Sequence, residues 1–395
     1  MAGAYPEACY SAAVRGRIRF SGWWACVALA LGCSGGRGDG GRRDGGAEDA
    51  LGARDARDAE DALDARLDAG EAPVGSADAG PDADSDADAE PDADADLTCG
   101  PSCGGSCVAG RCLVAIDVDE IHPYSIAVNA SHIYWTTTFT TPGLIMTAAR
   151  DGGLATVLVA GLDTPHTLVI DDNYLYWTSY TLGTGAILRM PINGGSVTTL
   201  APAQDQPHGL AVDQTNIYWT NLPGGTVLKM PLEGGPITPL ASGQPSPTNL
   251  VVDAHFVYWT NWIGATGSVM KVPIEGGVVE TIAAGQDLPY GVAVDATNVY
   301  WTTNGGTVMK RPLAGGDAVA LASGQVAPYG IAIDEVAVYW SSYDTTGNGA
   351  LMRVPITGGA PVKLIAAASF GFTIDATSIY WTNYEEGTVW KLTPR

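Results

Sequence analysis

Short apolar segments alternate with glycine- and aspartate-containing turns along residues 113–395. In the third of several similar units, the apolar residues fall into four short runs, which are typical of β-strands rather than helices. Asp213 and Asn216 mark the turn between the first two runs, and Gly234-Gly235 marks a hairpin that needs positive φ angles. We label the strands of a unit A to D and expect them at 209–212, 217–220, 226–231 and around 237–240.

A Tyr-Trp pair marks strand B of every unit, at steps of 39 to 42 residues. The pairs are Tyr134-Trp135, Tyr176-Trp177, Tyr218-Trp219, Tyr258-Trp259, Tyr300-Trp301, Tyr339-Trp340 and Tyr380-Trp381. A period near forty with four strands per unit is typical of β-propeller blades. We therefore predict an all-β, seven-bladed β-propeller with four antiparallel strands per blade. Successive strand residues point to opposite faces, and both faces of a blade pack on neighbours, so both rings of each pair should be buried.

The two ends of the repeat region complement each other. The last repeat reaches Arg395 after strand C and has no strand D, whereas an apolar segment, 113–116, precedes the first unit. The segment ends seven residues before Pro123, and strand D of an internal unit ends the same number of residues before the corresponding proline, as Ile282 does before Pro289. We expect it to complete the seventh blade by pairing Val114 with the region of Val389, which closes the ring and removes an open sheet edge.

The N-terminal region predicts export. An apolar run, residues 20–32, follows three arginines and is too short to span a bilayer, but it fits the core of a signal peptide. It ends at Cys33 in Ala-Leu-Gly-Cys, which resembles a bacterial lipobox with its first two residues exchanged. Residues 1–33 are therefore expected to form a signal peptide, and Cys33 to carry a lipid that anchors the chain in the bacterial cell envelope, at the outer membrane or the surface. Cleavage at a nearby non-lipid site, giving a secreted or periplasmic protein, is the alternative.

Residues 34–98 consist largely of Gly, Ala, Asp and Arg. With few large apolar residues they cannot form a core, so we expect a disordered linker. A calcium loop needs turn glycines and a closing Glu in register, so a solvated tether is favoured over a calcium site for the Asp-x-Asp alternation near the end of the linker. Much of the net charge of −23 lies in this linker. The acidic balance argues against nucleic acid as a partner, since phosphate binding needs clustered Lys and Arg.

Four cysteines, Cys99, Cys103, Cys107 and Cys112, lie between the linker and the repeats, in a Cys-rich brace spanning 99–112. In an exported chain they favour two disulfides, with three connectivities open. A four-thiolate zinc site is the alternative, but the spacing does not form the paired Cys-x-x-Cys of such sites.

The Tyr-Trp motif resembles that of the YWTD β-propellers of lipoprotein-receptor ectodomains and their bacterial relatives, over residues 113–395. The resemblance implies the propeller fold. Two departures keep the receptors' ligand chemistry from being carried over. The receptors have six blades, whereas this chain has seven repeats. The Asp at the fourth position of the receptor motif is replaced in all seven repeats, by Thr137, Ser179, Asn221, Asn261, Thr303, Ser342 and Asn383.

Two further positions recur around the ring. Strand A ends in a carboxylate or an amide, namely Asn129, Asp171, Asp213, Asp253, Asp295, Asp334 and Asp375. Such a ring could hold a metal, but its repetition in nearly every unit favours capping of the A–B turns. Strand C carries a basic residue in six units, namely Arg189, Lys229, Lys271, Lys310, Arg353 and Lys391. We expect their stems to lie over apolar neighbours and their charges to be exposed.

The candidate binding residues gather on one face. Because the strands alternate in direction, the D–A links and the B–C loops must share a face of the ring. Just before strand A, the D–A links carry Tyr124, His166, His208, Thr248, Tyr290, Tyr329 and Phe370, and the variable B–C loops add Tyr180, Trp262, Tyr343 and Tyr384. Variable loops on a rigid scaffold are where function usually lies. The alternative is that these rings only plug the mouth of the channel.

We expect a non-catalytic extracytoplasmic recognition module that binds a saccharide, a peptide or an envelope protein on this D–A/B–C face. No cofactor or metal is expected, and the protein should be a monomer. One alternative is a channel-face hydrolase or lyase of lactonase type, with His166, His208 and Glu385 or Glu386 as its candidate residues. The other is a passive envelope scaffold.

Overall fold

The computed structural model describes residues 99, 103–118, 120–138, 142–342, 349–367 and 369–395. The chain divides into Met1–Ala93 and Asp94–Arg395, and all the described residues belong to the second unit. The predicted signal peptide with Cys33, the linker 34–98 and the candidate Tyr343 therefore lie outside the described residues. None of the described residues forms a helix long and apolar enough to cross a membrane.

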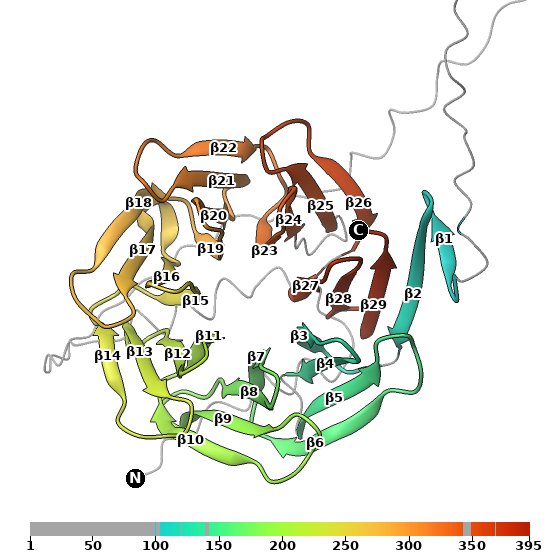
Figure 1. Ribbon diagram of the computed structural model, residues 1–395, viewed down its shortest axis with the longest axis horizontal. Coiled ribbons are helices and arrows are strands. Elements are labelled where there is room, and N and C mark those ends of the chain that lie inside the picture. Colours follow the sequence, from blue (N-terminus) through green and yellow to red (C-terminus); the bar gives the residue numbers. More distant parts are fainter. Residues whose placement is uncertain (1–98, 100–102, 119, 139–141, 343–348, 368) are drawn as a thin grey trace, which may run out of the picture. The chain divides into compact units, whose positions relative to one another are not determined.

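Seven antiparallel sheets form a closed ring, with strand A of each blade innermost (Figure 1). Blades one and two are β3 (Pro123–Val128), β4 (His132–Thr137), β5 (Gly143–Ala149), β6 (Thr156–Leu162) and β7 (Pro165–Ile170), β8 (Tyr174–Ser179), β9 (Gly185–Pro191), β10 (Thr198–Gln204). Blades three and four are β11 (Pro207–Val212), β12 (Asn216–Asn221), β13 (Thr226–Pro231), β14 (Thr238–Ala241) and β15 (Pro247–Val252), β16 (Phe256–Asn261), β17 (Gly267–Pro273), β18 (Glu280–Gln286). Blades five and six are β19 (Pro289–Val294), β20 (Asn298–Thr303), β21 (Thr307–Pro312), β22 (Val319–Ala322) and β23 (Pro328–Ile333), β24 (Ala337–Ser342), β25 (Ala350–Pro355), β26 (Val362–Ala366).

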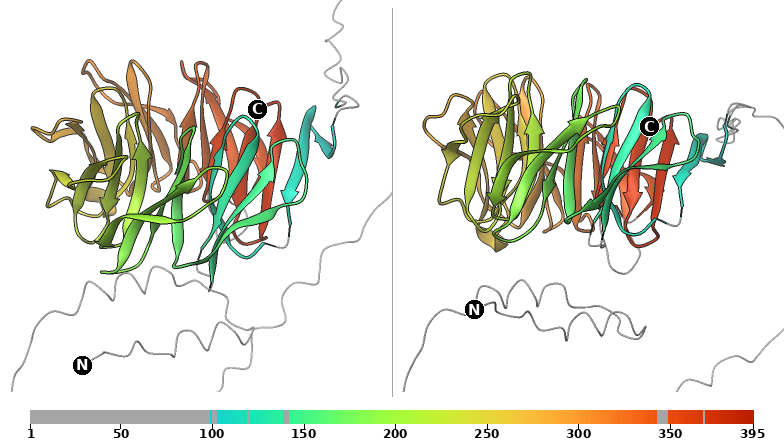
Figure 2. Two further views of the ribbon diagram at one scale, coloured as in Figure 1. Left: turned by 60° about the horizontal axis from the view of Figure 1, so that its bottom comes forward. Right: turned by 90° about the horizontal axis from the view of Figure 1, so that it is seen from below.

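The seventh blade joins the two ends of the propeller. Its order is β1 (Ser106–Val108), β2 (Arg111–Asp117), β29 (Thr388–Thr393), β28 (Ile379–Asn383) and β27 (Phe372–Ile374). In the register of β2 on β29, Val114 lies opposite Lys391 and Asp117 opposite Val389. The predicted seven-bladed fold, closed by an N-terminal strand, is confirmed. The side views show the blades standing next to one another around the ring (Figure 2), and the described residues contain a single helical turn, the 3₁₀ turn Gly264–Thr266 (η1).

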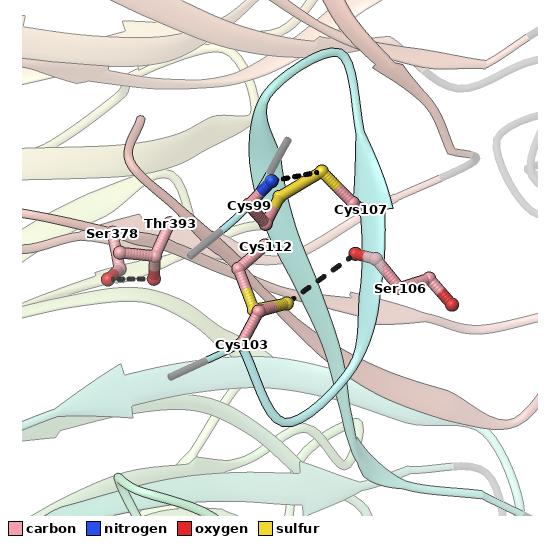
Figure 3. The surroundings of a disulfide bond; sticks show 7 residues. All are labelled: Cys99, Cys103, Ser106, Cys107, Cys112, Ser378 and Thr393. Atoms are coloured by element: carbon pink, nitrogen blue, oxygen red, sulfur yellow. Dashed lines mark hydrogen bonds between the residues drawn. A yellow bond between two sulfur atoms is a disulfide. The ribbon is translucent and has the colours of Figure 1, made fainter. Parts of the chain in front are cut away.

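The cysteine brace lies beside the closing strand (Figure 3). Disulfides join Cys99 to Cys107 and Cys103 to Cys112, which selects one of the three connectivities left open by the sequence. Cys112 belongs to β2, and its register partner in β29 is Thr393. The second disulfide therefore ties the loop before β1 to the strand that closes the ring.

The repeated Tyr and Trp side chains form the cores between blades. All seven Trp rings are at most 2% exposed, and all seven Tyr rings at most 3%. In blades two to seven the Tyr hydroxyl donates to the Asp that ends strand A, as Tyr218 does to Asp213 at 2.6 Å. The other oxygen of Asp213 accepts the backbone N–H groups of Thr215 and Asn216. The carboxylates cap the A–B turns, as their repetition predicted.

The threonine that follows the Trp links neighbouring blades. The hydroxyl of Thr260 donates to the carbonyl of Tyr290 in the next blade at 2.7 Å, and the hydroxyl of Thr302 donates to that of Tyr329. Hydroxyls at this position also accept a backbone N–H from strand A of their own blade, as Thr302 does from Gly291. One small polar side chain thus satisfies buried backbone groups of two blades.

The basic residues of strand C do not carry exposed charges, so that expectation was wrong. Five of the six donate to a backbone carbonyl of the following blade, an arrangement that we call the interblade clamp. Their acceptors are Leu232 O for Arg189, Ile274 O for Lys229, Ile356 O for Lys310, Arg395 O for Arg353 and Arg150 O for Lys391. The head groups are partly buried at the blade boundaries, where their hydrogen bonds join one blade to the next.

Candidate functional site

The D–A links hold an unusual backbone conformation. In six blades the residue before the proline that opens strand A has a positive φ without being glycine, namely His122, Thr164, Gln206, Ser246, Leu288 and Ala327. Five of their carbonyls accept the N–H of the first B–C loop residue, as Thr164 O does from Tyr180 and Ser246 O from Trp262. The links and the loops therefore meet on one face, as the topology predicted. Such conformations are costly and persist only where the surroundings hold them, so this face is rigidly built.

The side chains that open strand A meet in one network of rings at the axis. The neighbouring ring centroids are separated by 4.3 Å (Tyr124–His166), 4.7 Å (His166–His208), 5.9 Å (His208–Tyr290), 3.6 Å (Tyr290–Tyr329), 5.4 Å (Tyr329–Phe370) and 5.6 Å (Phe370–Tyr124). Blade four contributes the small, fully buried Thr248 instead of a ring. The network is continuous there because His208 of blade three contacts Tyr290 of blade five directly. Six of the sequence-predicted candidates are thus brought together.

The network has a buried part and a half-buried part. His166, His208 and Tyr290 are 4%, 6% and 6% exposed, whereas Tyr124, Tyr329 and Phe370 are half-buried. The buried rings fill the space between the innermost strands at this level. Tyr124 contacts His166 and Tyr329 contacts Tyr290, and burial raises the pKa values of Tyr124 and Tyr329 well above their usual range.

Burial keeps the network uncharged at neutral pH. It lowers the pKa of His208 to about 4, and burial followed by repulsion from His208 lowers the pKa of His166 well below its usual range. Burial likewise raises the pKa of Tyr290 to about 12. Nε2 of His208 lies 3.4 Å from the Tyr290 hydroxyl, and its Nδ1 is buried with no hydrogen-bond partner in the described part of the chain. The site consequently offers ring faces and neutral hydroxyls rather than ions.

Two B–C loop rings extend the network outward. Tyr180 stacks on His166 at 4.7 Å, and Tyr384 meets Phe370 edge-on at 5.4 Å. Both are half-buried, as is Trp262 at the same position of its own loop. Burial raises the pKa values of Tyr180 and Tyr384 to about 12, so both hydroxyls stay protonated.

The carboxylates proposed for an enzyme lie beside Tyr384. Glu385 and Glu386 are exposed, and Asn383 Nδ2 donates to Glu386 Oε2 at 2.8 Å. The described residues contain no group of three or more His, Cys, Asp or Glu side chains placed to hold a metal ion. Nδ1 of His166 forms a hydrogen bond of 3.2 Å with the Thr167 hydroxyl, and the tautomer of the ring decides which of the two atoms is the donor.

Sequence reasoning missed two features next to this face. His122 stacks on Tyr384 with centroids 4.4 Å apart and planes within 9°; its place directly before a strand-opening proline could have revealed it. Glu120 lies close to the ring closure, where burial and then the Asp117 carboxyl raise its pKa to about 7. No repeat points to Glu120, because the segment before the first blade has no counterpart in the other blades.

No protein-family model and no curated protein sequence matches the chain. Among solved structures, virginiamycin B lyase from Staphylococcus aureus is 14% identical, with a TM-score of 0.60 over 72% of this chain and 99% of that one. A streptogramin B lyase is 13% identical, with a TM-score of 0.61 over 72% and 98%. A nidogen/laminin complex is 20% identical, with a TM-score of 0.48 over 58% and 90%. At such identities the lyases share the propeller fold alone, and the YWTD character of the repeat stays a prediction.

Proposed function

We propose that this chain is a non-catalytic recognition module whose D–A/B–C face binds a saccharide, a peptide or another envelope protein. The observation that carries the proposal is the network of eight contacting rings across the axis. Five of the rings belong to half-buried residues, namely Tyr124, Tyr180, Tyr329, Phe370 and Tyr384. Tyr124 and Tyr180 contact the buried His166, and Tyr329 contacts the buried Tyr290.

The chemistry of these rings suits recognition. Tyrosine presents a large apolar face and a hydroxyl with few rotatable bonds, so it gives contact area at low entropic cost. The left-handed links fix the rings before a partner arrives, and this preorganisation lowers the cost of binding. Trp262 and the residues of the other B–C loops would add the contacts that distinguish one ligand from another.

The module is proposed to act outside the cytoplasm. The arginine-flanked apolar run ending at Cys33 supports export and lipid anchoring, with 34–98 as the tether. Two disulfides in the Cys99–Cys112 brace support an oxidising compartment, because such bonds persist there and are rare in the cytosol.

A passive envelope scaffold is the second candidate. The contact of His208 with Tyr290, from blades that are not neighbours, favours it, because rings that meet across the axis also stiffen the fold. A hydrolase or lyase is the least favoured of the three functions. Burial lowers the pKa values of both histidines, and the described residues hold no group of three or more His, Cys, Asp or Glu side chains placed to bind a metal ion.

Screening the full chain on glycan and peptide arrays tests the proposal. A recognition module should bind a restricted set of related ligands, and Tyr384→Ala should abolish this binding. The control is Tyr174→Ala, which removes a half-buried tyrosine from the start of strand B, at the A–B end of its blade. Binding that survives Tyr384→Ala and Trp262→Ala together would rule out this face, and the absence of any ligand would favour the scaffold.

A further inference from the structure

Two blade boundaries lack the interblade clamp on the opposite, A–B face of the ring: that of blades one and two, where Thr147 stands in place of the cation, and that of blades four and five. Lys271 of blade four is the single strand-C cation that does not form the interblade clamp: its Nζ instead pairs with Glu280 of its own blade at 3.3 Å. The carbonyl that corresponds to the clamp acceptors of the other blades belongs to Leu313. Within the described residues, no side chain donates to Leu313 O.

The cause of the difference can be read from the register. The residue opposite the strand-C cation on strand D is Thr198, Thr238, Val319 or Val362 in other blades, but Glu280 in blade four. Among these strand-D residues only Glu280 carries a carboxylate, whereas the acids that pair with Arg189 and Lys229, Glu233 and Glu275, belong to the following blade. Glu280 therefore holds Lys271 over the Phe256 ring, 4.4 Å from its centroid, and away from the boundary with blade five.

A groove of about 600 Å³ opens at this boundary. Its walls are Asp253, Phe256 and Tyr258 of blade four and Asp295 and Leu313 of blade five, with Lys271 at one side. Its volume lies within the range of small-ligand sites. Its charge is acidic, because Asp253, Asp295 and the neighbouring Glu280 outnumber Lys271.

Both kinds of acceptor in the groove bind cations elsewhere in the same molecule. Carbonyls equivalent to Leu313 O accept Lys or Arg in five blades. Capping carboxylates equivalent to Asp253 bind a guanidinium from the following blade at two boundaries: Arg150 lies 3.0 Å from Asp375, and Arg395 lies 2.7 Å from Asp334.

The capping contacts leave Asp253 room for such a partner. Its Oδ1 accepts the N–H groups of His255 and Phe256, and its Oδ2 accepts the Tyr258 hydroxyl. Asp375 carries the same backbone and tyrosine contacts and still binds Arg150. A carboxylate has about four acceptor sites, so one remains open on Asp253.

We propose that this groove binds a ligand bearing a guanidinium or primary ammonium group on an aliphatic stem. The cation would lie between Asp253 and Leu313 O, where other blades hold a cation of their own, and the stem would pack along Phe256. An arginine or lysine side chain of a peptide and a free alkylguanidine share this chemistry. The site is independent of the D–A/B–C face, which lies at the other end of the strands.

Titration calorimetry on the full chain tests the proposal with two pairs of probes. The first pair is butylguanidinium and its neutral counterpart butylurea; the second is a short arginine peptide and the same peptide with citrulline. We expect at least one guanidinium probe to bind at least about tenfold more tightly than its neutral counterpart. The guanidinium probe that binds more tightly shows whether the cation comes from a peptide side chain or from a free alkylguanidine. Binding of neither, or equal binding of the neutral counterparts, would overturn the site.

The variant Glu280→Thr links binding to the missing clamp. It installs the threonine of blades two and three, frees Lys271 to reach Leu313 O, and should weaken guanidinium binding at least about tenfold. The melting temperature should not fall, which separates this effect from misfolding. Glu275→Thr removes a more exposed acid that pairs with Lys229 and does not line the groove, and it should leave binding unchanged. A folded Glu280→Thr chain that binds like the wild type would contradict the proposal.

Discussion

The hydroxyl of Thr382 in the last blade donates to the carbonyl of Tyr124 in the first at 2.6 Å, between residues 258 positions apart in the chain. The same contact joins neighbouring blades elsewhere, so the ends of the ring are joined as internal blades are. Lys391 adds the interblade clamp to Arg150 O across the same boundary. The closed ring thus rests on side-chain contacts as well as on the pairing of β2 with β29.

Replacing Thr382 with valine should weaken the closure. Valine keeps the shape but leaves the partly buried Tyr124 carbonyl without its side-chain donor, so the free energy of unfolding should fall by about 1–2 kcal/mol. Urea unfolding of the full chain measures this. Thr382→Ser keeps the hydroxyl and should recover most of the loss; equal losses in both variants would show that the methyl group, not the hydrogen bond, matters.

Removing the disulfide between Cys103 and Cys112 by a double change to alanine should lower the free energy of unfolding by about 2 kcal/mol, because the cross-link restricts the unfolded chain. The β2–β29 pairing should persist, since its backbone hydrogen bonds do not depend on the sulfurs. Thermal unfolding with the wild type as reference gives the size of the effect. Peptide mapping without reduction checks the connectivity, and a Cys99–Cys103 peptide would contradict it.

The fold, the blade count and the closure could be predicted from the sequence because they follow from local repetition. Each Tyr-Trp pair and each Gly-Gly turn reports on its own blade, and the offset before Pro123 locates the closing strand. The capping role of Asp213 and its counterparts followed in the same way, since the cap and its turn are within three residues of each other.

Contacts between blades could not be predicted in this way. Arg189 reaches Leu232 O, 43 residues away, only because of the angle at which one blade packs on the next. Likewise, the meeting of His208 with Tyr290 depends on the radius of the channel. The sequence placed the candidate rings on one face, but it did not indicate which would be buried.

Acid should weaken the capped turns. Burial alone would raise the pKa of Asp213, but the Tyr218 hydroxyl and the N–H groups of Thr215 and Asn216 outweigh it and lower the pKa below 3.8. The resulting stability is present above about pH 4 and is lost as the pH falls through the lowered pKa. Asp295 and Asp375 are shifted in the same direction.

The variant Tyr218→Phe tests this dependence. It removes one donor to Asp213, so part of the stability difference between pH 6 and pH 3 should disappear, by about 0.5–1 kcal/mol. Unfolding by urea at both pH values provides the measurement. Tyr134→Phe is the matched control, because its partner is the uncharged Asn129. An unchanged pH dependence in Tyr218→Phe would contradict the capping account.

Glu120 should give the opposite pH dependence. Its pKa is raised from 4.5 to about 7 in the folded chain, so the fold retains a proton that the unfolded chain loses as the pH rises between these values. Its contribution to stability is therefore most favourable below about pH 4.5 and becomes unfavourable by about pH 7. Glu120→Gln should stabilise the chain at pH 8 by about 1 kcal/mol, a value reduced because the group is partly exposed, and should change little at pH 4. Greater stabilisation at pH 4 than at pH 8 would contradict the shift.

The central claim is that the D–A/B–C face is the recognition surface, and hydroxyl-radical footprinting of the full chain tests it most directly. A ligand from the arrays should protect Tyr180, Trp262 and Tyr384 from oxidation and leave Phe256 and Tyr174, at the A–B ends of their blades, unchanged. Protection of Phe256 and Tyr174 with no change at Tyr180, Trp262 and Tyr384 would contradict the account.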